Sequence, residues 1–324
     1  MHKAQKGQQF WYIWDKMGVL LIFIAVLIVF FLIDDNLADP GQLVNVVLRS
    51  TWIAVAAFGM TFAICSGGFD LSVGSIMSLA GCMMAKMIME NGMPTGVAII
   101  LTLLAAVVCG LVNGVLITKL KIQPFVATLA TMLIFDGVTQ TYTGNIGTFI
   151  STEKYGPLST LGRGSVLLPN KIWVMLFVFV VLYVVYKRTT FGVKVRAVGS
   201  NEAATRTSGI QADRTLILVY VLTAVTAALA AVLYTATVQS ASPNAGDGFE
   251  LDAITAVVLG GSALSGGKGN LFGTLIGAIL VQYVNMCMNY LGAPEAMHVI
   301  ITGVVLVFAL SISGIRVITQ KKEG

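Results

Sequence analysis

The stretch KRTTFGVKVRAVGSNEAATRTSGIQADR (187–214) is the longest polar and basic interval between apolar segments in the second half of the chain. It holds six Lys and Arg residues, and apolar segments lie before and after it. An interval of this kind connects two apolar parts of a fold through water. It therefore divides the chain into a first part, 17–186, and a second part, 215–315.

The composition shows what surrounds this interval. Hydrophobic residues make up 56% of the 324 residues and charged residues only 11%, with a mean hydropathy of +0.87. An average soluble domain is about 25% charged, so too few charges are present to cover a water-soluble fold. The chain is therefore an all-α integral membrane protein, and its 34 glycines suit close helix packing in lipid. The net charge of +5 is not a nucleic-acid signal, because Lys and Arg are retained on one side of a bilayer.

Ten apolar stretches are candidate transmembrane helices. They are 17–33, 44–65, 70–89, 95–118, 123–143, 172–186, 215–237, 251–266, 271–291 and 296–315. Short polar tails, 1–16 and 316–324, flank them. The basic flank before 17–33 also suits a signal peptide, but no small-x-small cleavage site follows, so we interpret this stretch as a retained span.

The distribution of Lys and Arg predicts the orientation. With the N-terminus inside, fifteen of the 20 Lys and Arg residues lie on the inner side and five on the outer side. Both termini are then cytoplasmic, as is 187–214. The longest outer loop is 144–171, which is rich in Gly, Ser and Thr.

A short motif occurs twice. GFDL (68–71) recurs as GFEL (248–251), and the pair VN at 112–113 recurs at 284–285. With the predicted topology, the first GF[D/E]L motif lies near the inside and the second near the outside. This pattern predicts two inverted five-span halves with interrupted helices, a transporter plan. A four-residue match also arises by chance in an apolar chain of low complexity.

Within the polar interval, 199–210 is predicted to form a short helix. Ser200 or Asn201 is the N-cap, and Glu202 suits the first turn. Ala203 and Ala204 favour helix, Arg206 suits the last turn, and Gly209 is the expected residue after the C-cap. A helix this short is marginal alone in water. It is either a surface that docks on another protein or a plain surface helix in a connecting loop.

Acidic and amide side chains occur in or beside the apolar stretches and are candidates for lining or gating a pathway. They are Asp70, Ser72, Asn113, Asp136, Glu250, Asp252 and Asn285. Asp70 and Glu250 precede apolar runs, so we favour helix capping over a proton or cation relay. The two asparagines either hydrogen-bond between helices or line a pathway.

Catalytic and metal chemistry find little support. The four cysteines lie in or at the ends of apolar stretches without a CxxC pair, which indicates small core residues. GGSALSGGKGN (260–270) does not match a phosphate-binding loop, because Gly269 rather than Ser or Thr follows Lys268. We therefore expect no ATP site, metal or other cofactor in this chain.

Four long segments resemble the permease subunits of bacterial ABC importers for monosaccharides, the ribose permease family. They are GMTFAICSGGFDLSVGS (59–75), VNGVLITKLKIQPFVATLATM (112–132), TTFGVKVRAVGSNEAATRTSGI (189–210) and GFELDAITAVVLGGSALSGGKGNLFGTLIGA (248–278). The resemblance extends nearly end to end, and 1–16 and 144–171 match least.

The resemblance implies an ATP-driven importer in the bacterial inner membrane. It implies cytoplasmic ATPase subunits that carry ATP and Mg²⁺, an extracytoplasmic sugar-binding protein, and a second permease chain, either identical, forming a homodimer, or different. It also implies that the segment from Ser200 to Gly209, with Asn201, Glu202, Ala203, Ala204 and Arg206, docks on the ATPase. A branched-chain amino-acid permease and an ion-coupled secondary transporter are the alternative functions.

Overall fold

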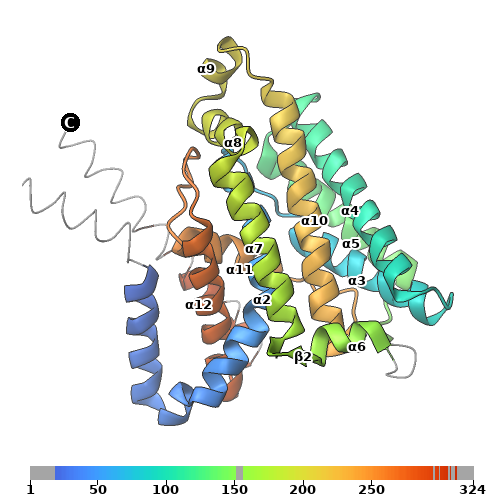
Figure 1. Ribbon diagram of the computed structural model, residues 1–324, viewed down its shortest axis with the longest axis vertical. Coiled ribbons are helices and arrows are strands. Elements are labelled where there is room, and N and C mark those ends of the chain that lie inside the picture. Colours follow the sequence, from blue (N-terminus) through green and yellow to red (C-terminus); the bar gives the residue numbers. More distant parts are fainter. Residues whose placement is uncertain are drawn as a thin grey trace, which may run out of the picture.

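The computed structural model describes residues 19–150, 156–294, 296–298, 300–305, 307 and 311. The predicted all-α class is confirmed, since a bundle of helices makes up most of this part of the chain (Figure 1). The helices are Val19–Ile33, η1 (Asp35–Ala38), α2 (Pro40–Cys65), α3 (Val73–Met89), α4 (Thr95–Thr118), α5 (Pro124–Thr143), α6 (Gly156–Arg163), α7 (Asn170–Arg188), α8 (Thr190–Ser200), α9 (Glu202–Thr207), α10 (Ala212–Val238), α11 (Phe249–Leu259) and α12 (Leu271–Tyr290).

Two pairs of two-residue strands complete the described elements. β1 (Thr148–Phe149) pairs antiparallel with β4 (Ser240–Ala241), which follows the end of α10. β2 (Ser165–Val166) and β3 (Leu168–Pro169) form a hairpin before α7. The predicted outer loop 144–171 therefore contains β1, α6, β2 and β3, although 151–155 lie outside the described residues. α6 and β2 lie at the end of the molecule opposite α9 (Figure 1).

Five helices in the described residues are long and apolar enough to cross a membrane. These are α2, α4, α7, α10 and α12. Val19–Ile33 and α3 are shorter apolar helices. The stretch 251–266, predicted as a span, forms only α11, whose 11 residues cover about 16 Å at 1.5 Å per residue. That length is roughly half of the hydrocarbon core, and the glycines after Leu259 end the helix, so this stretch does not cross by itself.

The centre of the bundle is formed by α2 and α10. α10 packs on α2, α3 and α4, whereas α2 also packs on α11, α12 and α7. Alanines dominate the buried face of α10, including Ala224, Ala227, Ala228 and Ala231. Small side chains let helix backbones approach closely in an apolar environment, where dispersion and backbone packing hold helices together.

Glycines set a close approach between α4 and α10. A Cβ atom added at Gly110 would lie 2.5 Å from the Cα atom of Val221, and one added at Gly114 would lie 2.8 Å from the Cα atom of Ile217. Neither neighbour is the flexible end of a side chain. These two positions therefore exclude any residue larger than glycine unless the helices separate.

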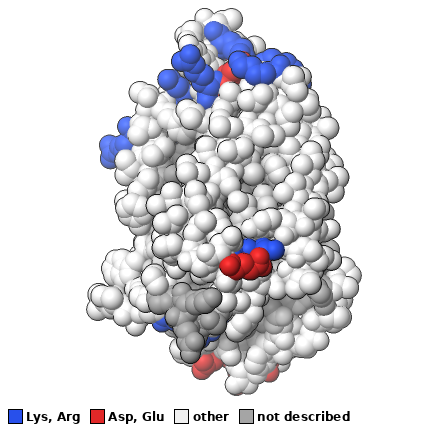
Figure 2. Space-filling model, turned by 90° about the vertical axis from the view of Figure 1, so that its right-hand side faces the viewer, with Lys and Arg blue, Asp and Glu red and all other residues white. Residues whose placement is uncertain are grey.

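Lys and Arg side chains are concentrated at one end of the long axis of the molecule. Figure 2 shows Lys and Arg gathered at the end that carries α9, whereas most of the face below is white. Exposed apolar residues such as Leu133, Phe177 and Leu218 lie on α5, α7 and α10. This is the surface expected of helices that face lipid.

We predict that Gly110→Val destabilises the bundle by about 1–3 kcal/mol, because the added atoms overpack the interface between α4 and α10. Gly137→Val is the matched control, since Gly137 is also helical and a Cβ there would meet nothing within 4 Å. Thermal unfolding of the detergent-purified protein measures the difference. Equal melting temperatures for the two variants would contradict the close packing of α4 on α10.

Candidate functional site

The short helix predicted in 199–210 is confirmed as α9. The side-chain oxygen of Asn201 accepts a hydrogen bond from the backbone N–H of Ala204 at 2.9 Å, so Asn201 is the N-cap. Glu202 lies in the first turn and Arg206 in the last. Gly209 has φ +80°, as expected for the residue after a C-cap. Ser200, the alternative N-cap, is instead the last residue of α8.

Sequence reasoning did not predict α8. Its N-cap is Thr189, whose hydroxyl accepts from the N–H of Gly192. Phe191, Val195 and Val198 recur at helical spacing, and the two valines are buried. That periodicity could have revealed the helix. The polar and basic character of 187–214 indicated only an interval outside the membrane.

α9 presents its small residues to solvent at the end of the molecule (Figure 1). Asn201, Glu202, Ala203 and Ala204 are all exposed, whereas Thr205 is buried. The Thr205 hydroxyl donates to the carbonyl of Asn201 at 2.7 Å and so stays within the helix. The outer face of α9 is therefore free for contact with another molecule.

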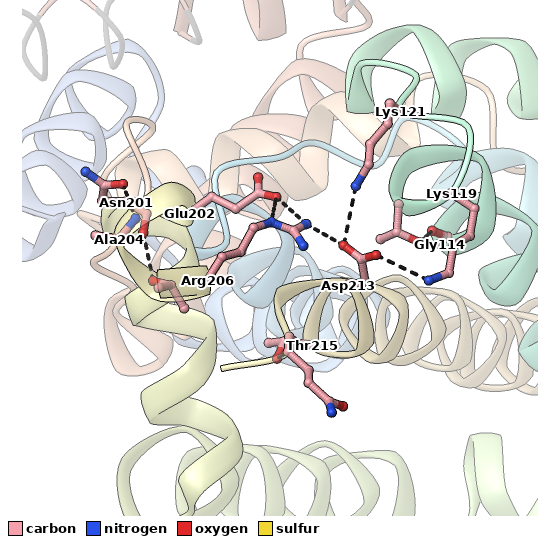
Figure 3. A network of polar contacts seen from close by, with 12 residues as sticks. Gly114, Lys119, Lys121, Asn201, Glu202, Ala204, Arg206, Asp213 and Thr215 are labelled. Carbon is pink, nitrogen blue, oxygen red and sulfur yellow. Dashed lines mark hydrogen bonds and ion pairs between the residues drawn. The ribbon is translucent and has the colours of Figure 1, made fainter. Parts of the chain in front are cut away.

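An ion-pair network attaches α9 to the bundle (Figure 3). Arg206 donates to Glu202 in its own helix, at 2.6 Å, and to Asp213 at the start of α10. Lys119 and Lys121, from the connection between α4 and α5, approach Asp213 at 3.3 Å and 3.5 Å. The hydrogen bond from Arg206 to Asp213, followed in importance by its hydrogen bond to Glu202, raises the pKa of the Arg206 guanidinium.

The network compensates for the short length of α9. Each exposed ion pair contributes only about 0–1 kcal/mol to stability. Here, however, Lys119, Lys121 and Arg206 all pair with Asp213, and Glu202 pairs with Arg206. They join three segments, α9, α10 and the connection between α4 and α5. Sequence reasoning did not single out Lys119, Lys121 or Asp213, because only the fold brings them together.

The first helix break lies between α2 and α3. Asp70 is fully buried, and its Oδ1 atom accepts hydrogen bonds from the backbone N–H of Ser72 at 3.0 Å and from the Ser72 hydroxyl at 2.6 Å. Asn113 of α4 donates to the Ser72 hydroxyl at 2.8 Å, and Thr131 of α5 donates to Asn113 at 2.6 Å. Three predicted residues, Asp70, Ser72 and Asn113, thus form one buried chain, to which the structure adds Thr131.

The second break lies between α10 and α11. Asn285 of α12 donates to the carboxylate of Asp252 at 3.2 Å, so these two candidate residues meet. Glu250 reaches across to α3, because a Cβ atom added at Gly74 would lie 2.5 Å from its Oε2 atom. The same added atom would lie 2.3 Å from the carbonyl oxygen of Gly246. The second break therefore lies against the first turn of α3.

The predicted acids divide by position. Asp70, Glu250 and Asp252 all lie next to the first turn of α3 or α11, where carboxylates compensate the positive end of a helix dipole. Asp136 lies half-buried within α5, two turns from its end. Within the described residues it joins neither hydrogen-bonded set. The arrangement suits caps of interrupted helices.

Residues 42–310 match the family described as branched-chain amino acid transport system / permease component. The chain is 40% identical over 312 residues to the ribose import permease of Bacillus subtilis (strain 168), which covers 96% of each chain. It is 39% identical over 297 residues to the ribose import permease of Escherichia coli (strain K12), covering 90% of each. It is 36% identical over 285 residues to the galactofuranose transporter permease of the same organism, covering 87% of this chain and 82% of the relative. No solved structure matches.

We predict that Asn113→Ala lowers the stability of the purified protein by about 1–3 kcal/mol, since it removes the two buried hydrogen bonds that join Ser72 to Thr131. Asn289→Ala is the control, because Asn289 is exposed and bonds only to the backbone of its own helix. Thermal unfolding in detergent compares the two variants. If Asn113→Ala unfolds no earlier than Asn289→Ala, the buried chain does not stabilise the break.

We predict that Asp213→Asn speeds hydrogen exchange of the α9 backbone amides by roughly 2–5-fold at low salt, because it removes the carboxylate on which the network converges. High salt should reduce the difference from the parent protein, since salt screens exposed pairs. Asp35→Asn, an exposed aspartate in η1, is the control. Unchanged exchange in α9 would show that the network does not hold this helix.

Proposed function

Since the chain belongs to the family of branched-chain amino acid transport system / permease components, we infer that it is the membrane permease subunit of an ATP-driven importer for a monosaccharide. The observation that carries this function is the 40% identity to a ribose import permease over 96% of both chains. Identity at this level over nearly the whole chain extends to both helix breaks and to α9. It leaves no large segment to carry a different activity.

The relatives favour a sugar over an amino acid. The family description names branched-chain amino acids, but the similar proteins are named for ribose and galactofuranose. We therefore propose ribose or another pentose or hexose as the substrate, with a branched-chain amino acid as the alternative.

We propose that α9 docks on a cytoplasmic ATPase subunit, which carries the ATP and Mg²⁺. Its exposed small residues support this role, because a partner can approach the backbone there without displacing long side chains. An extracytoplasmic binding protein would deliver the sugar, and a second copy of this chain would complete the pathway. This arrangement places both termini in the cytoplasm of a multi-pass inner-membrane protein.

We further propose that ten spans form two inverted halves, on either side of the coupling segment 187–214. Two observations support this. Exchanging α2, α3 and α4 with α10, α11 and α12 exchanges their main contacts: α10 packs on α3 and α4, while α2 packs on α11 and α12. The side-chain pairs Ser72–Asn113 and Asp252–Asn285 occupy corresponding places, two residues after the acid of each GF[D/E]L motif.

The direction of the helices supports inversion. α2 ends near α8, since a Cβ atom at Gly67 would lie 3.8 Å from the Cα atom of Gly199. α10 begins at that end, after α9, and ends where β4 pairs with β1. α2 therefore ends, and α10 begins, toward the end that carries α9, so these two helices run in opposite directions, which supports inverted halves.

The mechanism we propose is alternating access, in which closure of the ATPase subunits displaces α9 and the two halves rock about a pathway. The residues Asp70, Ser72, Asn113, Glu250, Asp252 and Asn285 would hold the interrupted helices in each state, and Asp136 would face the pathway. Tight sugar contacts are not needed within the membrane, because the binding protein selects the substrate.

Reconstitution tests this function. The chain is co-purified with a candidate ABC ATPase, placed in liposomes with a candidate sugar-binding protein, and supplied with labelled ribose, galactose, allose or leucine. ATP-dependent uptake of a sugar is expected. Uptake of leucine alone would support the amino-acid alternative, and sugar accumulation on an ion gradient without ATPase would support a secondary transporter.

We predict that Ala204→Glu reduces ATP-driven uptake at least about tenfold while leaving membrane insertion intact, because it buries a charge in the proposed docking surface. Asn91→Glu adds the same charge to an exposed site far from α9 and is the control. Uptake and co-purification of the ATPase are measured together. Normal uptake and normal co-purification by Ala204→Glu would exclude α9 as the docking surface.

A further inference from the structure

The end of α8 is packed against two other segments with no side chain between the backbones. A Cβ atom added at Gly199 would lie 1.8 Å from the carbonyl oxygen of Cys65, the last residue of α2. It would also lie 2.7 Å from the backbone nitrogen of Gly267, in the loop that follows α11. The connection between α8 and α9 thus touches both segments at its backbone.

The same two segments bind each other at this point. The N–H of Gly267 donates to the carbonyl of Cys65 at 2.8 Å, which satisfies the last residue of α2. Gly266 and Gly267 have φ values of +81° and +77°, a conformation that side chains disfavour. A Cβ atom at Gly266 would lie 2.5 Å from the carbonyl oxygen of Gly199. Gly266 and Gly267, in the stretch 260–270 that the sequence leaves without a function, are therefore required by this three-way contact.

Tyr186, near the end of α7, contacts each of the segments that meet at this point. Its side chain is buried, and its hydroxyl accepts a hydrogen bond from the N–H of Gly269 at 2.7 Å. The same hydroxyl lies 3.4 Å from the thiol of Cys65. Arg196 of α8 donates to the carbonyl of Tyr186 at 2.6 Å. One residue thus links α2, α7, α8 and the glycine loop.

We propose that this junction, formed by Cys65, Tyr186, Gly199 and Gly266–Gly269, is a rigid coupler that passes displacement of α9 directly to the first helix break and, through α11, to the second, with Tyr186 as its positioning residue. Cys65 directly precedes the break that leads to α3, and the glycine loop directly follows α11. This inference rests on the proposed function, because it explains how motion at the docking surface reaches the interrupted helices.

Close packing is the reason that the coupler is rigid. Backbone atoms in direct contact cannot be compressed, and no flexible side chain lies between them to absorb a displacement. A push on α9 is transmitted through Ser200 and Gly199 to the end of α2 and to the loop at the same time. The hydroxyl of Tyr186 keeps the loop in register with α2 while they move.

The first test is Tyr186→Phe, which removes the hydroxyl and keeps the ring. Without this acceptor the N–H of Gly269 loses its partner, and we expect sugar transported per ATP hydrolysed to fall roughly fivefold while the ATPase still co-purifies. Tyr183→Phe removes the same group from an exposed tyrosine of α7 and is the matched control. A merely structural role would lower the melting temperature without changing this ratio. A ratio equal to that of Tyr183→Phe would overturn the proposal.

The second test is a cross-link with Ser200→Cys and Gly267→Cys. A Cβ atom at Gly267 would lie 3.3 Å from the Cβ atom of Ser200, close to the spacing of a disulfide. A rigid junction predicts equal uptake in the oxidised and reduced states of this double variant. Uptake that stops on oxidation and returns on reduction would show that the two segments move apart and would overturn the proposal. If the double variant does not assemble, Tyr186→Phe decides.

The parent complex separates the two levels of failure. If it imports none of the sugars supplied, the proposed function fails, whatever the variants do. If it imports sugar and Tyr186→Phe imports it with an unchanged ratio to ATP, the function stands and the coupler is wrong.

Discussion

Inside a bilayer, every backbone N–H and C=O group must find a partner within the protein, and two helices of this chain are nevertheless interrupted in an apolar bundle. Polar side chains in the apolar stretches meet this requirement by forming hydrogen bonds at the breaks. At the first break, Asp70 binds the backbone of Ser72, and Asn113 and Thr131 extend the chain of hydrogen bonds into α4 and α5. At the second break, Asn285 binds Asp252. Polar groups at both breaks are therefore hydrogen-bonded to neighbouring helices and are not exposed to lipid.

The same constraint explains the high glycine content. Interrupted helices can be buried only if other backbones come close to them, and side chains would keep those backbones apart. Gly74 lies against Gly246 and Glu250, and Gly110 and Gly114 bring α4 onto α10. Gly199 lets α8 reach the end of α2, and Gly266 and Gly267 let the loop after α11 join them. Close packing of this kind also makes the bundle suited to transmitting displacement between distant segments.

Basic residues gather at one end of the molecule, and ion pairs there position α9, a helix that packing alone holds poorly. α9 has six residues and one buried side chain, so it depends on Arg206 and Asp213 for its place. Because Arg206 is exposed and Asp213 is partly exposed, their ion pair orients α9 without locking it. An element that meets a moving partner benefits from this combination of a defined position and a weak attachment. The rigid contact at Gly199 lies immediately behind it.

The amino-acid sequence by itself determined the membrane class, the limits of most helices, and the residues at both ends of α9. These follow from composition and from contacts within one helical turn, which are readable locally. The sequence also indicated that Asp70 and Asp252 belong to helix starts. It did not reveal α8, because basic residues obscured an apolar period of one helical face, and it made 251–266 a span although α11 is short.

Only the tertiary structure decided which distant residues meet. Asn113 reaches Ser72, Asp213 joins Lys119 to Arg206, and Gly199 touches Cys65, although each pair is far apart in the chain. It also left Asp136, within α5, outside both hydrogen-bonded sets in the described residues. Such pairings depend on how helices pack, and helix packing is set by the summed shapes of many side chains rather than by any local pattern.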